Sequence, residues 1–426
     1  MSHRPALSSL QLIFLSAMSY QTLSAAAVLV LLATPAVGQQ FPQRKVLKLA
    51  EKQAAEMLRQ MPPAVQRQAS AAPGKPVLVA PRTLTPAGEL IVVPSRDWTS
   101  GFFPGYLWLL HEATGKPQWQ TVAREYTARI EPEKTNGTTH DMGFKVYCSY
   151  GTGYRVTKDP AYRDVILQAA RTLSTRFYPK VGTLLSWDHS RDKWAFPVII
   201  DNMMNLELLF AATRLSGDSS FYKIAVSHAN TTLQNHFRPD FSSFHVVDYD
   251  SASGRVIKRQ THQGYAHESA WARGQGWALY GYTLCYRATR NPTYLKQAEE
   301  VARFILTHPN LPADGVPYWD FNAPNIPKEP RDASAAAVIA SGLYELSTYS
   351  QNGPEYRRQA DRILTSLATS YTAKPSSSRG FLLLHSTGSK PAKSEVDGPL
   401  SYADYYFMEA LVRRKSLAAG NALPLL

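Results

Sequence analysis

The stretch IIDNMMNLELLF at residues 199–210 carries apolar side chains at most positions around a helix. A helix that is apolar on all sides has to be surrounded by protein. The next helical pattern, SSFYKIAVSHANTTLQNHF at residues 219–237, is amphipathic, so only one of its faces needs cover. Together the two stretches predict a buried inner helix followed by a partly exposed outer helix.

The same pairing of a buried with an amphipathic helix recurs along the chain. There are six of each kind at an irregular spacing of about 40 to 70 residues, which is repeat-like without strict repetition. Six inner helices inside six outer ones predict an all-α fold, the (α/α)6 barrel, with long loops around a funnel where the inner helices begin. A straight solenoid is the alternative, but it favours uniform repeats and capping ends. Inner helices are expected to begin near Thr99, Asp141, Asp201, Ser269, Asp332 and Ser401, and outer helices to cover residues 44–60, 117–130, 160–177, 219–237, 292–307 and 355–371.

The first residues differ in composition from the rest. Residues 1–40 contain no acidic side chain, and a short apolar run at 25–33 precedes Thr34-Pro-Ala-Val-Gly38. This pattern predicts a secretory signal peptide over residues 1–38, followed by a single barrel domain over residues 39–426. An uncleaved anchor is the alternative, but a run of about nine residues is short of the roughly 20 that a membrane span needs. We therefore expect export to the periplasm or the medium, with no stable membrane span after cleavage.

Three features lie apart from the main helical pattern. Residues 61–88 are rich in proline, alanine and glycine and are expected to form a loop or strap. Residues 244–248 and 254–260 are expected to form a short hairpin between two helix pairs. Cys148 and Cys285 each lie inside an apolar helical pattern, which is compatible with two buried free thiols and with a disulfide.

The formal net charge of +13 indicates an anionic partner, although solubility alone would also account for it. Nucleic acid is a poor candidate because Lys and Arg residues are scattered and no recognition motif accompanies them. With 44% hydrophobic and 19% charged residues, the chain has the composition of a folded protein rather than a disordered one.

Acidic residues stand where several inner helices are expected to begin. Asp141 lies in THDMGF, Asp332 lies in PRDAS, and Asp201 follows the apolar run at 196–200. Asp is a preferred N-cap, so helix capping explains any one of them alone. The apolar wall around Asp201, and Gly143 beside Asp141, distinguish these two. Acid/base chemistry on a sugar ring requires two such carboxylates facing one funnel, one held protonated while the other stays charged.

Tryptophans mark the same ends of the helices. Core packing explains any one of them equally well, but a tryptophan beside polar loop residues is well placed to stack on a sugar ring. The candidates are Trp98, Trp187, Trp271 and Trp277.

Residues 245–277 form the densest polar cluster in the chain and include His245, Gln263 and Arg273. Arg273 is suited to bind a substrate carboxylate through two parallel hydrogen bonds, and a buried bond to a carboxylate of the protein is the alternative. The histidines of the cluster show no recognised metal-ligand spacing, so we expect no metal site here.

The motifs that carry these residues resemble those of glycoside hydrolase family 88, the unsaturated glucuronyl hydrolases. The resemblance runs from about Trp98 to Ala410, and the order and spacing of the blocks make it specific, although each block alone is modest evidence. The blocks are WTSGFFPG (98–105), THDMGF (139–144), IIDNMMNLELLF (199–210), THQGYAHESAWARGQGW (261–277), PRDASAAAVIASGLYEL (330–346) and SYADYYFMEAL (401–411).

The resemblance implies an (α/α)6 barrel without a metal or organic cofactor, and an anionic unsaturated oligosaccharide as substrate. It implies that Asp201 is the general acid/base and Asp141 the second essential carboxylate. Residues 266–268, Ala-His-Glu, depart from the more acidic run expected in the family, which bears on the fine substrate preference. The other site residues that the resemblance implies are His140, Trp98, Trp187, His245, Gln263, Trp271, Arg273 and Trp277.

The implied reaction hydrates the double bond between C4 and C5 of a terminal uronic acid. Asp201 would protonate C4, water activated by the same residue would add at C5, and the resulting hemiketal would open and release the aglycone. Two alternatives stay open: an unsaturated rhamnogalacturonyl hydrolase acting on pectin fragments, and a non-catalytic carbohydrate-binding barrel. The carboxylate of Asp141 and the cluster at 245–273 favour a glucuronyl substrate of the glycosaminoglycan type.

Overall fold

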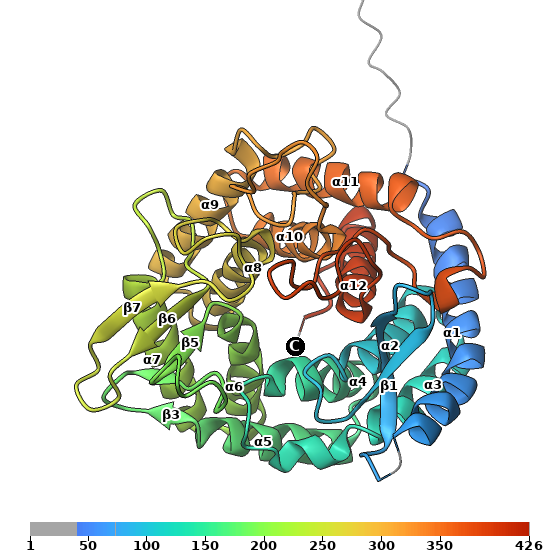
Figure 1. The fold of residues 1–426 in the computed structure, drawn as a ribbon, viewed down its shortest axis with the longest axis horizontal. Coiled ribbons are helices and arrows are strands. Elements are labelled where there is room, and N and C mark those ends of the chain that lie inside the picture. The colour runs from blue at the N-terminus through green and yellow to red at the C-terminus, as the bar shows by residue number, and fades with distance from the viewer. Residues whose placement is uncertain (1–40, 73, 426) are drawn as a thin grey trace, which may run out of the picture. The chain divides into compact units, whose positions relative to one another are not determined.

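An inner ring of helices surrounded by an outer ring makes up the segment Pro42–Leu426, as Figure 1 shows. The computed structural model describes residues 41–72 and 74–425, so the predicted signal peptide at 1–38 lies outside the described residues. The predicted alternation of buried and amphipathic helices is confirmed. The inner ring holds α2 (Phe102–Thr114), η2 (Gly143–Gly151) with α4 (Thr152–Thr157), α6 (Asn202–Ser216), α8 (Ala272–Thr289), α10 (Ala333–Leu346) and α12 (Ser401–Ala418); the outer ring holds α1 (Gln43–Ala71), α3 (Pro117–Ala128), α5 (Pro160–Ser174), α7 (Ser219–Asn235), α9 (Pro292–Thr307) and α11 (Gly353–Ser370).

Helices α10 and α9 show how sequence separates the two rings. All 14 residues of α10 are buried, and most of them are small, which lets neighbouring inner helices approach closely. In α9 the buried residues lie along one face, and Asn291 caps the helix by accepting a hydrogen bond from the backbone N–H of Thr293. Close approach also explains Gly281 in α8, because a Cβ atom there would lie 2.5 Å from the Cβ of Met203 in α6.

The second inner helix begins with a π-helical segment, η2, before it continues as α4. Wide π turns are frequently found at functional sites. The start of η2 is pressed against α6: a Cβ at Gly143 would overlap Asn205, and the Oδ1 of Asn205 accepts a hydrogen bond from the N–H of Phe144. This contact brings the segment that carries Asp141 beside the start of the helix that follows Asp201.

The prediction of a loop over residues 61–88 was wrong in its first part, because α1 continues to Ala71. Pro62 and Pro63 lie inside the helix on its exposed side, where carbonyl groups that lose their helical partners face water. On the opposite face Met61 and Ala64 stay buried. The apolar face of the helix therefore continues past the two prolines.

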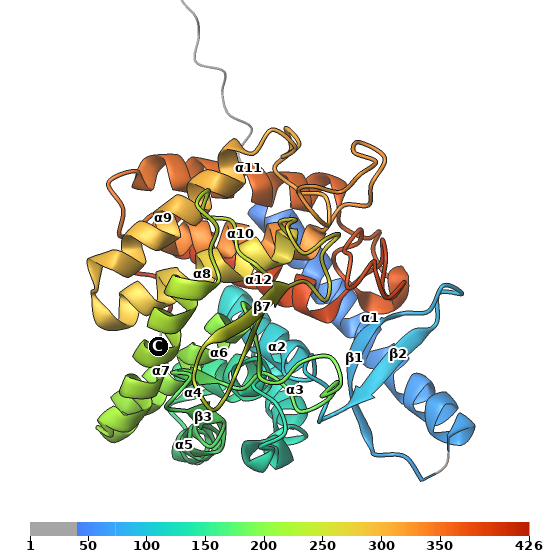
Figure 2. The same cartoon turned by 60° about the vertical axis from the view of Figure 1, so that its left-hand side comes forward.

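The second part of that segment is a β-hairpin that the sequence analysis missed. Strand β1 (Leu78–Leu84) pairs antiparallel with β2 (Leu90–Pro94). Figure 2 shows this hairpin beside α1. The hydroxyl of Thr83 in β1 donates a buried hydrogen bond to the carbonyl oxygen of Pro399, which lies just before α12. This bond anchors the hairpin next to the start of the inner helix α12.

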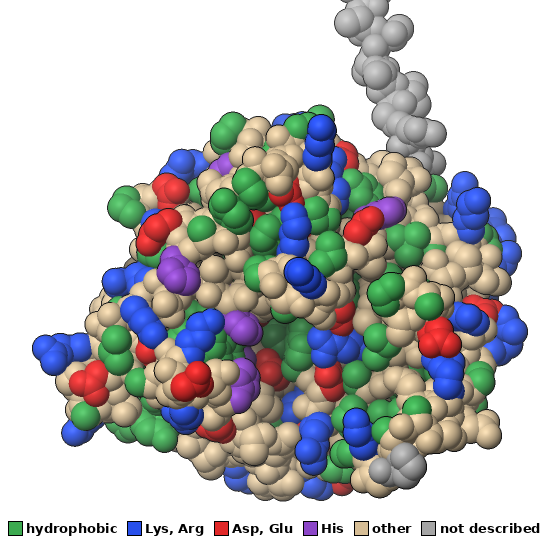
Figure 3. All heavy atoms as spheres, viewed as in Figure 1, with side chains coloured by type: hydrophobic (Ala, Val, Ile, Leu, Met, Phe, Trp, Pro, Cys, Tyr) green, Lys and Arg blue, Asp and Glu red, His purple; other side chains and the backbone are tan. Residues whose placement is uncertain are grey.

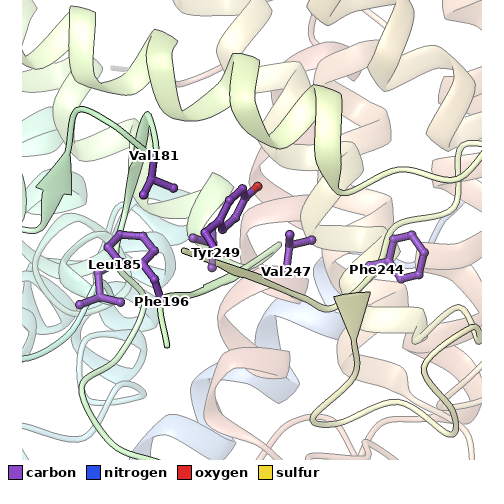
Figure 4. Packing of buried hydrophobic residues seen from close by; sticks show 7 residues of the cluster. Val181, Leu185, Phe196, Phe244, Val247 and Tyr249 are labelled. Atoms are coloured by element: carbon purple, nitrogen blue, oxygen red, sulfur yellow. The ribbon is translucent and has the colours of Figure 1, made fainter. Parts of the chain in front are cut away.

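The predicted hairpin over residues 244–248 and 254–260 is confirmed as β6 (Val246–Tyr249) and β7 (Val256–Gln260). A third strand, β5 (Pro197–Ile199), pairs antiparallel with β6, with Ile199 opposite Val246. The sheet packs on a buried apolar cluster that includes Phe196, Val247 and Tyr249 (Figure 4). The pairing of β5 with β6 places the residues just beyond Ile199 next to those just before Val246. A short pair, β3 (Phe177–Tyr178) and β4 (Thr183–Leu184), completes the strands of the described residues.

Two further predictions concern the described residues. Cys148 and Cys285 are both buried and free. Within residues 41–72 and 74–425 no helix is long and apolar enough to cross a membrane.

Candidate active site

A pocket of about 380 Å³ opens where the inner helices begin. Figure 3 looks into a hollow at the centre of the ring, where acidic and histidine side chains are exposed. Seven of the predicted site residues line this pocket: Trp98, His140, Asp141, Trp187, Asp201, Gln263 and Arg273. The other three, His245, Trp271 and Trp277, are not among its lining residues and are buried.

Asp201 stands at the start of α6 and at the end of the run that forms β5. Its side chain makes no capping hydrogen bond, so the helix-capping explanation does not apply here. Burial raises the pKa of Asp201 to about 7, the Arg273 charge opposes this rise, and the Asp141 carboxylate adds to it. The Oδ2 atom is buried without a hydrogen-bond partner among the described residues. Asp201 is therefore an acid that holds its proton close to neutral pH.

Asp141 precedes η2 and is more open to solvent than Asp201, with its side chain 18% exposed. The hydroxyl of Thr139 donates to its Oδ2 at 2.6 Å. On the other carboxylate oxygen, Oδ1 lies 3.2 Å from the Nε2 atom of His140. Burial lowers the pKa of His140, so this imidazole is neutral at physiological pH. The two neighbours hold the Asp141 carboxylate in place.

His245 lies directly behind Asp201. Its Nδ1 atom accepts hydrogen bonds from the backbone N–H groups of His262 and Gln263, both at 3.1 Å. Burial lowers the pKa of His245 well below its usual value, so the ring is neutral. A neutral ring that accepts at Nδ1 carries its proton on Nε2. This Nε2 atom lies 3.6 Å from the Oδ2 of Asp201, so the two groups are neighbours without a direct hydrogen bond.

Arg273 reaches the pocket, but its guanidinium group is bonded to the protein. It donates to the Oδ2 of Asp332 at 2.8 Å and to the carbonyl oxygens of Thr387 and Gly388 at 2.6 and 2.7 Å. Both partners of the ion pair are almost fully buried. Arg273 was expected to bind either a substrate carboxylate or a carboxylate of the protein, and the structure shows a bond to the protein carboxylate of Asp332. Its positive charge still acts on Asp201 by lowering the pKa of that group.

The predicted aromatic residues divide into two groups. Trp98 and Trp187 line the pocket, and Trp187 is stacked on His189 with an interplanar angle of 7°. Trp271 and Trp277 are core residues that pack behind the wall: Trp271 lies against His245 with ring centroids 4.5 Å apart, and Trp277 is fully buried. Neither is among the lining residues of the pocket, although the Trp277 side chain acts to lower the pKa of Asp201. Gln263 is bonded to the carbonyl oxygen of Gly388 through its side-chain amide at 3.0 Å.

Several pocket residues were missed by the sequence analysis. Tyr402, in α12, is 1% exposed and lines the pocket, and its hydroxyl has no hydrogen-bond partner among the described residues. Its ring lies 4.9 Å from that of Trp98. The motif SYADYYFMEAL marked this helix without singling out the tyrosine. Arg82 in β1 and the loop at residues 386–398 also contribute to the pocket, and neither carried a local sequence signal.

The described residues contain no group of three or more His, Cys, Asp or Glu side chains arranged to hold a metal ion. The ionisable and polar groups in or beside the pocket include the carboxyl groups of Asp141 and Asp201 and the neutral imidazoles beside them. Such a set can move protons and orient a sugar ring.

Comparison with known proteins matches residues 88–425 to the model of Glycosyl Hydrolase Family 88. An unsaturated glucuronyl hydrolase from Formosa agariphila is 54% identical over 340 residues, which cover 79% of this chain and 85% of that protein. An unsaturated chondroitin disaccharide hydrolase from Streptococcus pyogenes is 31% identical over 340 residues, covering 78% of this chain and 85% of that protein. The crystal structure of an unsaturated glucuronyl hydrolase specific for heparin superimposes with a TM-score of 0.82 at 43% identity, covering 88% of this chain and 98% of that one.

Proposed function

The chain belongs to glycosyl hydrolase family 88 and is an unsaturated glucuronyl hydrolase, and we propose that Asp201 is its general acid/base and Asp141 its second essential carboxylate. The observation that carries these roles is that both carboxyl groups line one pocket, with Asp201 the more buried of the two, and burial together with the Asp141 charge raises the pKa of Asp201 to about 7. An acid with a pKa near the working pH is the most effective proton donor.

The reaction begins with proton transfer from the Asp201 carboxyl group to C4 of the unsaturated uronic acid. Protonation of this enol ether places positive charge at C5, which the ring oxygen shares. Water then adds at C5, and the Asp201 carboxylate, now ionised, takes the proton that this water loses. The product is a hemiketal, which opens to a ketone at C5. The aglycone leaves when C1 collapses to an aldehyde.

The surroundings of Asp201 suit both halves of this cycle. The buried wall keeps the carboxyl group protonated before the first step, and the Arg273 charge stabilises the carboxylate after it. His245 holds a fixed tautomer whose Nε2 proton faces Asp201, so it acts as a positioning residue for the acid. Tyr402 lines the pocket and its buried hydroxyl has no hydrogen-bond partner among the described residues, so we propose that it donates to the bound substrate.

We propose that the substrate is an unsaturated disaccharide derived from a glycosaminoglycan, with heparin-type fragments preferred. The support is the structural likeness to the heparin-specific enzyme at 43% identity, together with the net charge of +13. Similarity to an unsaturated glucuronyl hydrolase and to an unsaturated chondroitin disaccharide hydrolase favours glucuronyl substrates over rhamnogalacturonyl fragments.

The test is turnover of purified enzyme on a panel of unsaturated disaccharides from heparin, chondroitin and pectin. The absorbance of the conjugated double bond should disappear as the aglycone is released, and reaction in heavy water should place deuterium at C4. Saturated glucuronides should stay intact because they have no double bond to protonate. Release of an intact unsaturated sugar with the solvent oxygen at C1 would instead indicate ordinary glycoside hydrolysis. Binding of the panel without any loss of absorbance would indicate a non-catalytic barrel.

We propose further that the enzyme is exported and that residues 1–38 are removed. The apolar run at 25–33 and the lack of acidic residues up to 40 support this. N-terminal sequencing of the protein recovered from the periplasm or the medium tests it, and a mature protein that starts at Met1 would contradict it.

A further inference from the structure

The loop at residues 386–398 forms one wall of the pocket and is tied down from several parts of the chain. It folds back on itself through backbone pairs between Ser386 and Gly398 and between Ser389 and Ser394. Its pocket-lining members are Gly388, Ser389, Ala392, Ser394 and Glu395.

Two of these ties are already part of the site. Arg273 and Gln263 both donate to the carbonyl oxygen of Gly388. They hold the segment of the loop that begins at Ser386, Arg273 from α8 and Gln263 from the loop that precedes α8. Both bonds are made to this first half of the loop, whereas the second half, which contains Glu395, pairs with the first half through the backbone.

The second half of the loop is held by Arg82 of the β1–β2 hairpin. The Nε of Arg82 donates to the Oε1 of Glu395 at 2.5 Å, and its NH2 donates to Oε2 at 3.1 Å. Its NH1 donates to the Oδ2 of Asp97 at 2.7 Å. The Arg82 side chain is 25% exposed and that of Glu395 only 9%, so the pair is partly shielded from water. A bidentate, partly buried pair of this kind is both directional and strong.

The Glu395 carboxylate also packs against the first half of the loop. A Cβ atom at Gly388 would collide with the carboxylate oxygen of Glu395. Arg82, Glu395 and Gly388 therefore form a continuous line of contacts that ends at Arg273. Strand β1 is itself a firm base for this line, because Thr83 is bonded to the carbonyl oxygen of Pro399.

We propose that Arg82 is a positioning residue for the reaction, which acts through Glu395 to hold the 386–398 loop against the substrate. The inference rests on the proposed function. Arg82 precedes residues 88–425, the part of the chain that the family model matches, so strand β1 adds to the site from outside the matched region. Asp201 is carried by α6 and backed by the β5–β6 pair, so loss of the Arg82 contact leaves the proton donor in place. Substrate binding should suffer more than the chemical step.

The experiment compares Arg82→Ala, Arg82→Lys and Glu395→Gln in the full chain, using an unsaturated disaccharide that the wild-type enzyme turns over. Arg82→Ala should raise KM about tenfold, the loss expected from one charge-assisted bond, with kcat within about twofold. Arg82→Lys keeps the charge but not the planar fork and should fall between wild type and Arg82→Ala. The double variant Arg82→Ala/Glu395→Gln should be no worse than Arg82→Ala, because both changes break one contact.

The matched control is Arg67→Ala. Arg67 of α1 holds the same hairpin from its other side, by a bond to the carbonyl oxygen of Leu90 and a 3.7 Å ion pair with Glu89. This variant should keep wild-type KM even where melting shows that the hairpin is loosened. A KM equal to wild type in Arg82→Ala, an equal rise in Arg67→Ala, or additive effects of Arg82→Ala and Glu395→Gln would each overturn the proposal.

Calorimetric titration in an Asp201→Asn background separates this proposal from the proposed function. In this background the disaccharide binds without turnover, and Arg82→Ala should raise its Kd about tenfold. An unchanged Kd overturns the role of Arg82, whereas a wild-type enzyme that binds the disaccharide and never consumes its double bond overturns the proposed function alone.

Discussion

The Nε2 atom of His245 lies 3.6 Å from the Oδ2 atom of Asp201, and two backbone N–H groups bonded to Nδ1 fix the proton of the neutral ring on Nε2. The two residues come together because Asp201 follows β5, His245 precedes β6, and these strands pair antiparallel. A neutral ring beside a buried acid adds no charge that would force the acid to ionise.

Asp201→Asn should reduce kcat by at least about a hundredfold, since it removes the proton donor with little change in volume. Far-ultraviolet circular dichroism should match wild type and melting should stay cooperative, which separates lost chemistry from lost folding. Retention of more than about a tenth of wild-type activity would contradict the role of Asp201 as acid.

The same substitution should stabilise the fold in a pH-dependent way. The folded-state pKa of Asp201 is raised from 3.8 to about 7, so the contribution of this group to stability is fully present below pH 3.8 and is lost as pH rises through about 7. At about 1.4 kcal/mol per pKa unit the loss is on the order of 4 kcal/mol. Asp201→Asn should therefore melt several degrees above wild type at pH 8 and almost level with it at pH 4. A difference in melting temperature that is the same at both pH values would show that ionisation of Asp201 is not its source.

Asp141→Asn should lower the pKa of Asp201, because it removes a nearby negative charge that raises this pKa. The general acid works in its protonated form, so the fall of kcat/KM on the alkaline side should move to lower pH. The residual activity of the variant, measured across pH, reports this shift. An alkaline limb at the wild-type position would show that the two carboxylates are not coupled.

Tyr402→Phe should lower kcat/KM about tenfold while leaving the free energy of unfolding within about 0.5 kcal/mol of wild type. Burial raises the pKa of Tyr402, so the hydroxyl stays protonated, and it has no hydrogen-bond partner among the described residues. Its removal therefore costs substrate contacts and not folding contacts. Tyr147→Phe is the matched control, since Tyr147 is also buried without a partner for its hydroxyl but lines a different cavity. Equal losses of activity in both variants would contradict a role in substrate binding.

Arg273→Ala should destabilise the fold by about 3–5 kcal/mol, because it leaves the buried carboxylate of Asp332 without its partner. Arg273→Lys keeps the charge but loses the planar fork, so its loss should be smaller. Urea denaturation measures both. If Arg273→Ala has wild-type stability and an altered KM, Arg273 chiefly binds substrate.

The sequence by itself determined which helices are buried and where they begin, because a helix that is buried on all sides is apolar at most positions, as residues 199–210 are. It also located Asp141 and Asp201, because both stand at helix starts within recognisable motifs. Only the tertiary structure decided which partners these groups have. Arg82 and Glu395 are 313 residues apart in the chain, and Arg273 and Asp332 are 59 apart. A local sequence pattern indicates which side chains of a helix are buried. An ion pair between distant segments depends instead on how the closed ring brings those segments together.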